Sequence, residues 1–589
     1  MSRERPAARW LPPAPAPDGV AEMLAAALQP VGPPADRAGQ AAVPLAVCRL
    51  LASRGIVTVD AAKRFLRPAI EQVESAEALA DLPRAADRLA AAVRAGEPIL
   101  VHGDYDVDGI CSTTLITKAL RALGGKVTPF IPDRMRDGYD LGPAGVAAAK
   151  ALGARVVLTC DCGTTAVPAG AALRDAAIDL IISDHHLPGG PLPPAFAMIN
   201  PRRADCPSID KDLAAVGVAY KLALAVTRRL GGDESGVHAM LDLVALATIA
   251  DVAPLRGENR VFVRLGLRQL QETRNLGLRA LIRAARLDGK PLTAGRVGFT
   301  LAPRLNALGR LRRAIRGVEL LLAEDEATAN TIARECEELN EKRQEMDRRI
   351  LDEATQRIDR MDLDATWGIV LDSADWHPGV IGIVASRVVE RTGRPAMMIA
   401  VQDGVGKGSG RSIGAFDLHD ALLRCTDLLV RHGGHRAAAG LTIEAALIPA
   451  FAERFNAVAR ERLTADDLVP RLRTDLELPL DQADEAFERA LRYLEPFGVG
   501  NPGPVMVARD VLIAAAPRKI GTDGIKLVLE TGRGRLDSVG WGLGSRSGEL
   551  RPGARVDLAY RLDVNEYQGT RTLQAVLQDF RASGGGSRA

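Results

Sequence analysis

The stretch that decides the fold is Pro98-Ile-Leu-Val-His102-Gly-Asp104-Tyr-Asp106-Val-Asp108-Gly109, a short apolar run followed at once by a histidine and three acids. The apolar run predicts a buried strand. His102, Asp104, Asp106 and Asp108 then stand at every second position, which in an extended chain directs all four side chains to one side. So much negative charge next to a buried strand requires a compensating cation.

Two further apolar runs repeat this arrangement. Residues 155–159 and 179–182 predict strands, and the Ala-rich segments between the runs predict helices, a pattern typical of βαβ units in a parallel sheet. Asp161 follows the first run, and Asp184-His185-His186 follow the second. Ligands of open α/β sheets bind at the carboxyl ends of strands, so these side chains should share one edge. Asp251, after an apolar helical run, is either a further ligand or an ordinary helix-end carboxylate.

The residue types in this set indicate the kind of ion. Several aspartates with a few histidines suit manganese or magnesium better than zinc or copper, and manganese is the preferred choice. The carboxylates suffice for two ions roughly 3.5–4 Å apart, the arrangement that hydrolyses phosphoesters. An EF-hand is excluded because its twelfth position is Leu115 rather than glutamate. A nucleotide P-loop is excluded because Gly406-Lys407 precedes Gly408 rather than serine or threonine.

Composition limits the class of protein. The chain has 589 residues, a net charge of +2, 47% hydrophobic and 25% charged residues, which fits two to four globular domains. Any nucleic acid must therefore be held in local grooves rather than by a global basic field. No apolar stretch reaches the roughly 18 residues of a membrane span. Seven scattered cysteines do not form a disulfide framework, so a reduced, cytoplasmic location is expected.

The texture of the chain changes several times. Residues 318–360 are charged and free of glycine and proline, which predicts a long connecting helix, whereas short alternating segments near the C-terminus predict a small β-barrel. The predicted parts are a flexible Pro/Ala-rich leader (1–45), an α/β domain with the acidic motifs (46–317), the connecting helix (318–360), a second α/β domain with Gly-rich loops (361–462), the barrel (463–582) and a flexible tail (583–589).

Together these motifs resemble the DHH phosphoesterase superfamily. The resemblance rests on His102-x-x-x-Asp106-x-Asp108, on Asp161 at the end of the next strand, and on Asp184-His185-His186. Within the superfamily, residues 50 to 580 resemble the RecJ family of bacterial single-stranded-DNA-specific 5′→3′ exonucleases. The further matching motifs are Arg54-Gly-Ile with Phe65-Leu66, Pro303-Arg-Leu-Asn306, Trp376-His-Pro-Gly-Val-Ile-Gly382, Gly408-Ser-Gly-Arg-Ser412, Gly433-Gly-His435 and Pro496-Phe-Gly-Val-Gly-Asn-Pro502.

The resemblance implies a division of roles at the metal centre. One ion would be held by His102, Asp106 and Asp161, and the other by Asp108, Asp161, His185 and Asp251, with Asp161 bridging. Asp104 and His186 would lie beside them, and His186 would contact the phosphate or assist the departing oxygen. The implied catalytic residues are Asp104, Asp106, Asp108, Asp161 and His186.

The resemblance also implies how substrate is held. Ser409, Arg411 and His435 of the second, DHH-associated domain would grip the terminal phosphate, helped by Arg134 and Arg304 of the first domain. The C-terminal segment would be an oligonucleotide-binding (OB) barrel that leads single-stranded DNA to the site. The chain departs from the family at Asp140, where glycine is usual, and at Arg312-Arg313, where an acid is common. These departures affect the substrate channel rather than the metal centre.

The residues by themselves indicate a metal-dependent phosphoester hydrolase. The resemblance implies a Mn²⁺- or Mg²⁺-dependent 5′→3′ exonuclease that degrades single-stranded DNA to 5′ mononucleotides in DNA repair and recombination. It also implies a RecQ-like helicase and a single-strand-binding protein as partners, and a monomer is expected. Two alternatives stay open: a phosphodiesterase of the same superfamily acting on short oligonucleotides or cyclic dinucleotides, and a non-catalytic DNA-binding scaffold. The scaffold would be expected to have lost metal ligands, yet all six positions are filled.

Overall fold

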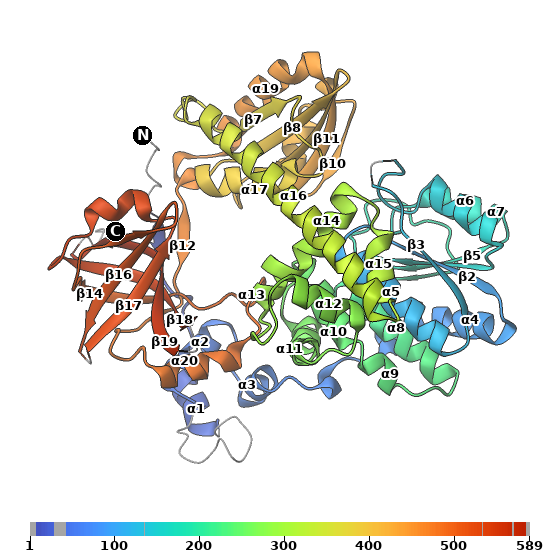
Figure 1. The fold of residues 1–589 in the computed structure, drawn as a ribbon, viewed down its shortest axis with the longest axis horizontal. Helices are drawn as coiled ribbons and strands as arrows, with labels where there is room; N and C mark the ends of the chain where they lie inside the picture. The colour runs from blue at the N-terminus through green and yellow to red at the C-terminus, as the bar shows by residue number, and fades with distance from the viewer. Residues whose placement is uncertain (1–7, 29–42, 135, 533, 568–569, 585–589) are drawn as a thin grey trace. The chain divides into compact units, whose positions relative to one another are not determined.

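The computed structural model describes residues 8–28, 43–134, 136–532, 534–567 and 570–584 (Figure 1). The chain forms two compact units. One comprises residues 64–343 together with 494–502, and the other comprises residues 1–63, 344–493 and 503–589. We call them the catalytic unit and the C-terminal unit and describe each by itself. The catalytic unit contains the acidic motifs, and the C-terminal unit contains the Gly-rich loops and the barrel segment.

The catalytic unit is built on a five-stranded parallel sheet with the order β3-β2-β4-β5-β6. The three strands predicted from the sequence are present, and the prediction of a parallel sheet is confirmed. Two strands at the edges, β3 and β6, were not predicted. The strands are β2 (Pro98–Gly103), β3 (Lys126–Phe130), β4 (Val156–Cys160), β5 (Asp179–Ser183) and β6 (Ala197–Ile199).

Helices cover both faces of this sheet, as Figure 1 shows. Successive strand residues point to opposite faces: Leu100 and Val157 pack with helices α6 and α7, whereas Ile99 and Val156 pack with α4, α5 and α8. With both faces buried, the strands become the nearly continuous apolar runs seen in the sequence. These helices are α4 (Leu82–Ala95), α5 (Val107–Ala122), α6 (Pro143–Leu152), α7 (Val167–Asp175) and α8 (Ala215–Arg229).

A helical layer follows the sheet along the chain. Its longest member, α16, begins at Glu326 rather than at residue 318, because Asp325 accepts a hydrogen bond from the Thr328 amide and caps the helix there. None of the helices within the described ranges is long and apolar enough to cross a membrane. The helices of this layer are α9 (Ser235–His238), α10 (Leu241–Ala250), α11 (Gly257–Gln271), α12 (Leu276–Ala284), α13 (Ala294–Arg296), α14 (Ala302–Leu311), α15 (Ile315–Leu321) and α16 (Glu326–Ile358).

The C-terminal unit contains a second α/β domain. Its five-stranded sheet has the order β10-β11-β9-β8-β7 and is parallel only between β7 and β8. Met397, Ile399 and Phe455 lie in the core beneath it. The elements are β7 (Ile369–Ser373), α17 (Ile381–Thr392), β8 (Ala396–Gln402), β9 (Val405–Arg411), α18 (Leu418–Leu423), β10 (Arg431–Gly434), β11 (Ala438–Glu444) and α19 (Ile448–Arg462).

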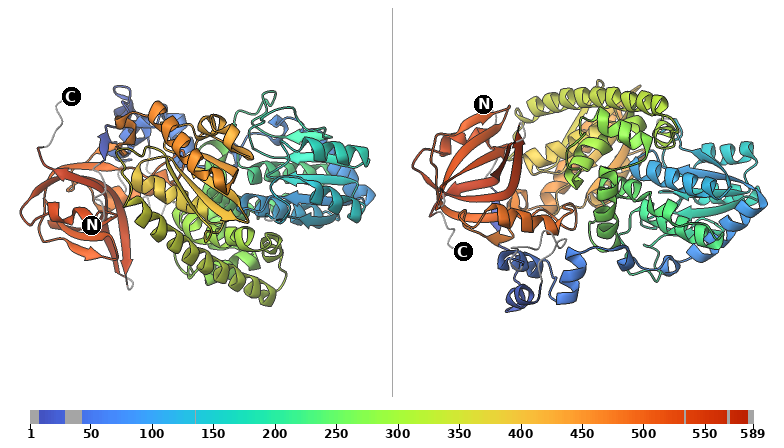
Figure 2. Two further views of the ribbon diagram at one scale, coloured as in Figure 1. Left: turned by 90° about the horizontal axis from the view of Figure 1, so that it is seen from above. Right: turned by 60° about the horizontal axis from the view of Figure 1, so that its bottom comes forward.

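The remainder of this unit is a seven-stranded sheet of order β13-β14-β18-β19-β17-β16-β15. Figure 2 shows that this sheet is strongly curved, and a bridge between Ile513 and Leu529 connects the residue after β14 to β16. The elements are β12 (Arg471–Arg473), β13 (Leu476–Glu477), α20 (Glu485–Leu491), β14 (Met506–Leu512), β15 (Arg518–Ile520), β16 (Gly524–Thr531), β17 (Gly534–Trp541), β18 (Arg555–Tyr567) and β19 (Thr570–Ala582).

The structure modifies the expectation of a flexible leader over residues 1–45. Within its described part, β1 (Arg9–Leu11) pairs in parallel with β12, and α1 (Val20–Ala27) packs against α2 (Leu45–Ser53). The Trp10 ring lies 4.4 Å from the Arg581 guanidinium, and its Nε1 donates a 2.8 Å hydrogen bond to Asp579. Such long-range pairings leave no periodic signal in a Pro-rich stretch. Residues 1–7 and 29–42 of the leader, and 585–589 of the tail, lie outside the described residues.

The Trp10 contact can be tested by Trp10→Phe, which keeps an aromatic ring over Arg581 but removes the donor to Asp579. We expect a loss of about 1 kcal/mol in local stability, the usual net value of one hydrogen bond. Faster hydrogen exchange of β19 amides would measure it, with Trp367→Phe, which removes a more exposed indole bond, as the control. Unchanged β19 exchange in Trp10→Phe would contradict docking of the N-terminal segment.

Candidate active site

The acidic motif occupies the junction between β2 and α5. His102 lies in β2, Asp104 lies in the turn, and Asp106 is the N-cap of α5, where its Oδ1 accepts hydrogen bonds from the amides of Asp108 and Gly109. Asp108 is already in the first helical turn. The expected alternation along an extended chain is therefore wrong beyond His102, because capping by Asp106 starts the helix inside the motif. The carboxylates still converge, but from a turn and a helix end.

Asp108 is fully buried and held in place by main-chain donors. Its two oxygens accept hydrogen bonds from the amides of Ala215 (3.0 Å) and Val216 (2.9 Å) at the start of α8, and Ser112 donates a third bond. The N-terminus of a helix stabilises negative charge. These contacts fix the position of the Asp108 carboxylate before any ligand binds.

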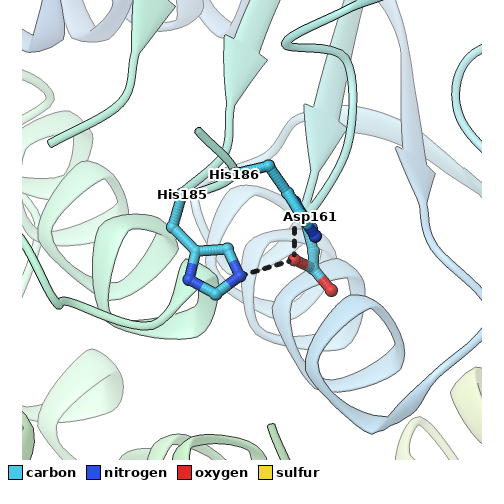
Figure 3. Close-up of side chains that lie close together, drawn as sticks. All are labelled: Asp161, His185 and His186. Atoms are coloured by element: carbon cyan, nitrogen blue, oxygen red, sulfur yellow. Dashed lines mark ion pairs between the residues drawn. The ribbon is translucent and has the colours of Figure 1, made fainter. Parts of the chain in front are cut away.

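Asp161 lies at the centre of the site, directly after β4 (Figure 3). Its backbone is in the left-handed region, with φ of 64°, which is costly for a residue with a side chain. Its Oδ1 lies 3.3 Å from His185 Nε2 and 3.7 Å from His186 Nδ1. His185 Nε2 also lies 3.8 Å from Asp251 Oδ2, which comes from the end of α10. Acidic and imidazole groups from two strands and one helix thus meet at this point.

Three overlapping groups of side chains could hold metal ions, and in each group the ligand atoms lie within 4.8 Å of one another. Asp161 belongs to two of the groups and His185 to two. Asp104, rather than His102, accompanies Asp106 and Asp161. The groups are Asp104/Asp106/Asp161, Asp108/His185/Asp251 and Asp161/His185/His186.

Burial makes this cluster of carboxylates electrostatically costly. Burial, and then the charge of Asp106, raises the pKa of Asp108 to about 7. The same causes, burial first and neighbouring carboxylates second, hold the pKa values of Asp104, Asp161 and Asp251 well above their usual range. Burial lowers the pKa of His185 to about 4, so its imidazole is neutral at pH 7. Raised carboxylate pKa values mean that the site favours a proton or a cation.

The donor set fits divalent cations. Asp104 Oδ1, Asp161 Oδ1 and His102 Nε2 are buried and have no hydrogen-bond partner among the described residues, although His185 lies near Asp161. Buried polar atoms without partners are rare and call for a ligand. Carboxylate oxygens with neutral imidazoles are the ligands that manganese accepts and that magnesium partly shares. His102 does not belong to the three groups above: its Nδ1 faces Cys162 Sγ at 3.5 Å, and its ring edge faces Gly145.

The pKa of His186 is shifted in the opposite direction from those of His102 and His185. Burial disfavours its protonation, but the hydrogen bond and charge of Asp184 raise the pKa of His186 to about 9. Asp184 Oδ1 lies 2.8 Å from His186 Nδ1, and Tyr139 Oη lies 3.2 Å from its Nε2. Asp184 also accepts hydrogen bonds from the amides of His185, His186 and Thr164. Asp184 thus orients His186 rather than facing a metal group itself.

A cavity of about 220 Å³ lies beside the cluster. It exists in this form because α14 approaches the acidic turn closely at Gly309, where a Cβ atom would lie 2.2 Å from the carbonyl oxygen of Tyr105. Of the expected substrate residues, Arg134 lines it, with its guanidinium 4.8 Å from the centre of the Tyr105 ring. The cavity is lined by Tyr105, Asp106, Arg134, Ala250, Asp251, Asn306, Gly309 and Arg310.

Arg304, the other arginine expected to contact substrate from this unit, lies elsewhere. It forms a bidentate ion pair with Glu337 of α16, at 2.5 and 2.9 Å, and also donates to the Thr300 carbonyl. Arg310, which the sequence reasoning missed, lines the cavity instead. Its spacing could have revealed it, because residues four apart on a helix share a face and Asn306 stands in a motif already noted.

The second set of expected substrate residues lies in the C-terminal unit. Ser409 and Arg411 are on β9, and both side chains face Gly382 in the first turn of α17, where a Cβ would lie 2.8 Å from Ser409 Oγ and 3.4 Å from Arg411 Nη2. His435 follows β10, and its amide bonds to the carbonyl of Ala438, the residue opposite Arg411. A helix N-terminus, a hydroxyl and a guanidinium together suit a phosphate.

Comparisons with known proteins agree with this architecture. Three family profiles match: the DHH family N-terminal domain (residues 98–248), the DHHA1 domain (366–461) and the RecJ OB domain (474–579). The single-stranded-DNA-specific exonuclease RecJ of Escherichia coli is 35% identical over 92% of this chain and 96% of its own length. The chain belongs to the RecJ family. The RecJ of Bacillus subtilis is 36% identical over 91% of this chain and 68% of its own length.

A solved RecJ structure extends this similarity to three dimensions. RecJ from Thermus thermophilus, in complex with Mn²⁺, superposes with a TM-score of 0.82 at 32% sequence identity, covering 97% of this chain and 79% of that one. The same protein has also been solved with Mg²⁺. The prediction of a DHH domain, a DHH-associated domain and a C-terminal OB domain is thus confirmed.

Asp140 and Arg312, two of the three residues at which the sequence analysis noted a departure from the family, have structural partners. Asp140 is in the left-handed region (φ 76°), and its Oδ1 accepts hydrogen bonds from the amides of Gly163 (2.7 Å) and Leu141. Its Oδ2 accepts a bond from the Thr165 hydroxyl (2.8 Å). Asp140 thus ties the loop that carries Tyr139 to the segment that follows Asp161. Arg312 forms an ion pair with Glu335.

The role of Asp140 predicts different outcomes for two substitutions. Asp140→Ala removes all three acceptor bonds and leaves a left-handed alanine, so we expect a loss of about 1–3 kcal/mol in the free energy of unfolding. Asp140→Asn tolerates the backbone and keeps an acceptor for both amides, so it should behave nearly as wild type. Urea denaturation followed by circular dichroism would compare the free energies of unfolding of the two variants. Equal stability would contradict the role of Asp140 in linking the two loops.

Proposed function

We propose that this chain is a metal-dependent exonuclease that degrades single-stranded DNA in the 5′→3′ direction and releases 5′ mononucleotides, in DNA repair and recombination. The observation that carries the proposal is the set of three overlapping, mostly buried ligand groups, linked by Asp161 and His185, next to a cavity lined by Arg134 and Arg310. Membership of the RecJ family, whose curated relatives are named single-stranded-DNA-specific exonucleases, supports the substrate. A RecQ-like helicase and a single-strand-binding protein stay predicted partners.

The residues that would hold two ions, Mn²⁺ or Mg²⁺, are Asp106, Asp108, Asp161, His185 and Asp251, with Asp104 as a neighbour and His102 as a predicted ligand. When bound, such ions act as Lewis acids that favour formation of the nucleophile and neutralise charge on the attacking and leaving oxygens. The preference for Mn²⁺ stays a prediction. Asp161 would be a ligand of both ions, as the family resemblance implies; in the structure, Asp161 and His185 each belong to two of the three groups.

The chain's own side chains would perform the remaining tasks. His186, with a pKa raised to about 9 by Asp184, is protonated at neutral pH and can donate a hydrogen bond to the phosphate or a proton to the departing oxygen. Arg134 and Arg310 line the cavity, where guanidinium groups stabilise the negative charge that develops on phosphate oxygens. Asp184 keeps His186 in one orientation through its bond to Nδ1.

We propose that the site formed by Ser409, Arg411, His435 and the first turn of α17 binds the terminal 5′-phosphate. A terminal phosphate carries nearly two charges near pH 7, whereas an internal phosphodiester carries one. A helix N-terminus beside a guanidinium group therefore prefers the terminal phosphate. This preference would give the enzyme its 5′ polarity. Arg304, paired with Glu337, would serve this function only after releasing that partner.

The OB domain would bind the single strand behind the end. Trp541, on β17, is 61% exposed, and its ring lies against Gly524 of β16, where a Cβ atom would come within 2.9 Å of Trp541 Cε3. Arg518 and Lys519 are exposed on the neighbouring β15. An exposed aromatic ring next to basic side chains suits base stacking and backbone contacts.

The domain limits stated in the sequence analysis, for the leader, connecting helix, substrate domain and OB domain, stay predictions.

The metal centre is tested by Asp161→Asn, which keeps the shape of the residue and tolerates its left-handed backbone. Loss of a residue that only hydrogen-bonds to a metal ligand typically lowers activity by roughly 10–100-fold. Asp161 is a proposed ligand itself, so we expect hydrolysis of single-stranded DNA to fall by more than that. DNA binding should remain measurable. The assay is digestion of an oligonucleotide labelled at either end, with Mn²⁺, with Mg²⁺ and with chelator.

The matched control for that experiment is Asp242→Asn, another buried aspartate of the catalytic unit that bonds to Thr273 outside the cluster. Undiminished turnover in Asp161→Asn would refute the centre. Binding without cleavage by the wild type would favour a scaffold, and cleavage of only very short oligonucleotides would favour the sister phosphodiesterase.

The phosphate site is tested by Arg411→Ala. We expect the preference for 5′-phosphorylated over 5′-hydroxyl strands to weaken about tenfold or more, the value of a charge-assisted hydrogen bond. Competition between the two labelled substrates would measure it. Arg424→Ala serves as control, because Arg424 pairs with Glu461 in the same domain. An unchanged end preference would remove Arg411 from phosphate recognition.

A further inference from the structure

A nine-residue segment from the C-terminal half of the chain belongs to the catalytic unit. Residues 494–502, which include the Pro496-Phe-Gly-Val-Gly-Asn-Pro502 motif, are grouped with residues 64–343. Only residues 503–505 separate the segment from β14, the first long strand of the OB domain. We call residues 494–502 the clip.

Buried side chains hold the clip through its main-chain carbonyl groups. Arg260, on α11, donates to the carbonyls of Leu494 (3.1 Å) and Glu495 (2.9 Å), and its guanidinium lies 3.7 Å from the centre of the Phe65 ring. Asn501 donates from its Nδ2 to the carbonyls of Leu494 and Pro496, both at 2.8 Å. Arg260 is 4% exposed and Asn501 is 2% exposed. Because these hydrogen bonds are made to main-chain carbonyl groups, they fix the path of the backbone whatever most of the clip's side chains are.

The surface that the clip contacts is the turn that carries Asp251. Asp251 ends α10, and the next four residues include Val252 in the left-handed region, with φ of 61°. The Leu255 amide donates a 2.7 Å hydrogen bond to the carbonyl of Val499. A Cβ atom at Gly498 would lie 2.7 Å from Leu255 Cδ1, and one at Gly500 would lie 3.0 Å from the Cβ of Pro254.

These contacts leave the turn with little freedom. On one side it continues from α10, with the amides of Asp251 and Ala253 bonded to carbonyls within that helix. On its other side, the turn packs against Gly498 and Gly500 of the clip, and side chains at these two positions would prevent so close an approach. Asp251 differs in this from Asp106 and Asp108, whose positions are fixed by hydrogen bonds of their own carboxylates to backbone amides.

We infer that the clip is a positioning element of the metal centre: it holds the turn so that Asp251 stays within ligand distance of His185 and Asp108. This inference rests on the metal centre of the proposed function. It assigns a role in metal binding to a segment that lies next to the OB domain in the sequence. The residues that act are Arg260, which anchors the clip to α11, Asn501, which closes the clip's own loop, and Gly498 and Gly500, which permit its close approach.

The test is Gly500→Ala in the full-length chain, with Mn²⁺ binding followed by the electron paramagnetic resonance signal of the free ion. Gly500 has φ of 75°, so alanine there is strained and also presses on Pro254. The matched control is Gly553→Ala, because Gly553 has φ of 79° but no atom within 4 Å of its Cβ position. Both variants place alanine in the left-handed backbone region at a similar energetic cost, and only Gly500→Ala also disturbs the turn that follows Asp251.

We expect Gly500→Ala to bind the weaker Mn²⁺ ion about tenfold less tightly, the size of effect that positioning groups behind metal ligands have. Turnover should fall at low Mn²⁺ and recover at high Mn²⁺, with the KM for single-stranded DNA unchanged. Gly553→Ala should match the wild type. Wild-type Mn²⁺ affinity in Gly500→Ala would overturn the inference, and so would a defect that excess Mn²⁺ does not rescue.

A second variant tests the inference in case Gly500→Ala does not fold. Asn501→Ala removes the two bonds that close the loop of the clip, without backbone strain. Asn456→Ala is its control, because the Asn456 side chain also bonds to backbone groups of a loop, in the second α/β domain. Only Asn501→Ala should weaken Mn²⁺ binding, and equal affinities in the two would overturn the inference. Absence of Mn²⁺ binding by the wild type would instead overturn the metal centre itself, and the role of the clip with it.

Discussion

The repulsion between buried carboxylates at the carboxyl edge of the parallel sheet is the constraint on which the catalytic unit depends. Asp104, Asp108, Asp161 and Asp251 are placed where water cannot solvate them well, and their pKa values rise accordingly. Part of the negative charge is offset locally, because the carboxylates of Asp106 and Asp108 accept hydrogen bonds from backbone amides at helix N-termini. The remainder calls for cations, and so the same arrangement that destabilises the apo site gives it affinity for divalent metal.

The scaffold around the cluster is shaped to hold these groups together. Asp161 keeps a left-handed backbone, α14 comes within contact of the acidic turn at Gly309, and Asp184 holds His186 in one orientation. Each of these features costs conformational freedom or local strain. Such costs are typical of functional sites, where pre-organised groups need not rearrange when the substrate binds. The surroundings also set the charge of the two histidines before substrate binds. Burial lowers the pKa of His185 to about 4, and Asp184 raises the pKa of His186 to about 9.

The two units divide the chemistry between them. The catalytic unit concentrates negative charge for cations, whereas the second α/β domain presents Ser409, Arg411 and a helix N-terminus, which suit an anion. The clip shows that the division along the chain is not strict, because a segment of the C-terminal half completes the turn beside Asp251.

The sequence by itself determined the parallel sheet, the acids at its strand ends and the membership of the superfamily, because apolar runs and motif spacing are local properties of the chain. It placed Asp161, His185 and Asp251 in one site, and the geometry agrees. Only the tertiary structure decided that Arg304 pairs with Glu337 while Arg310 lines the cavity, that Asp140 ties two loops together, and that the clip supports Asp251. Those outcomes depend on which distant segments pack together, and that packing has no periodicity in the sequence.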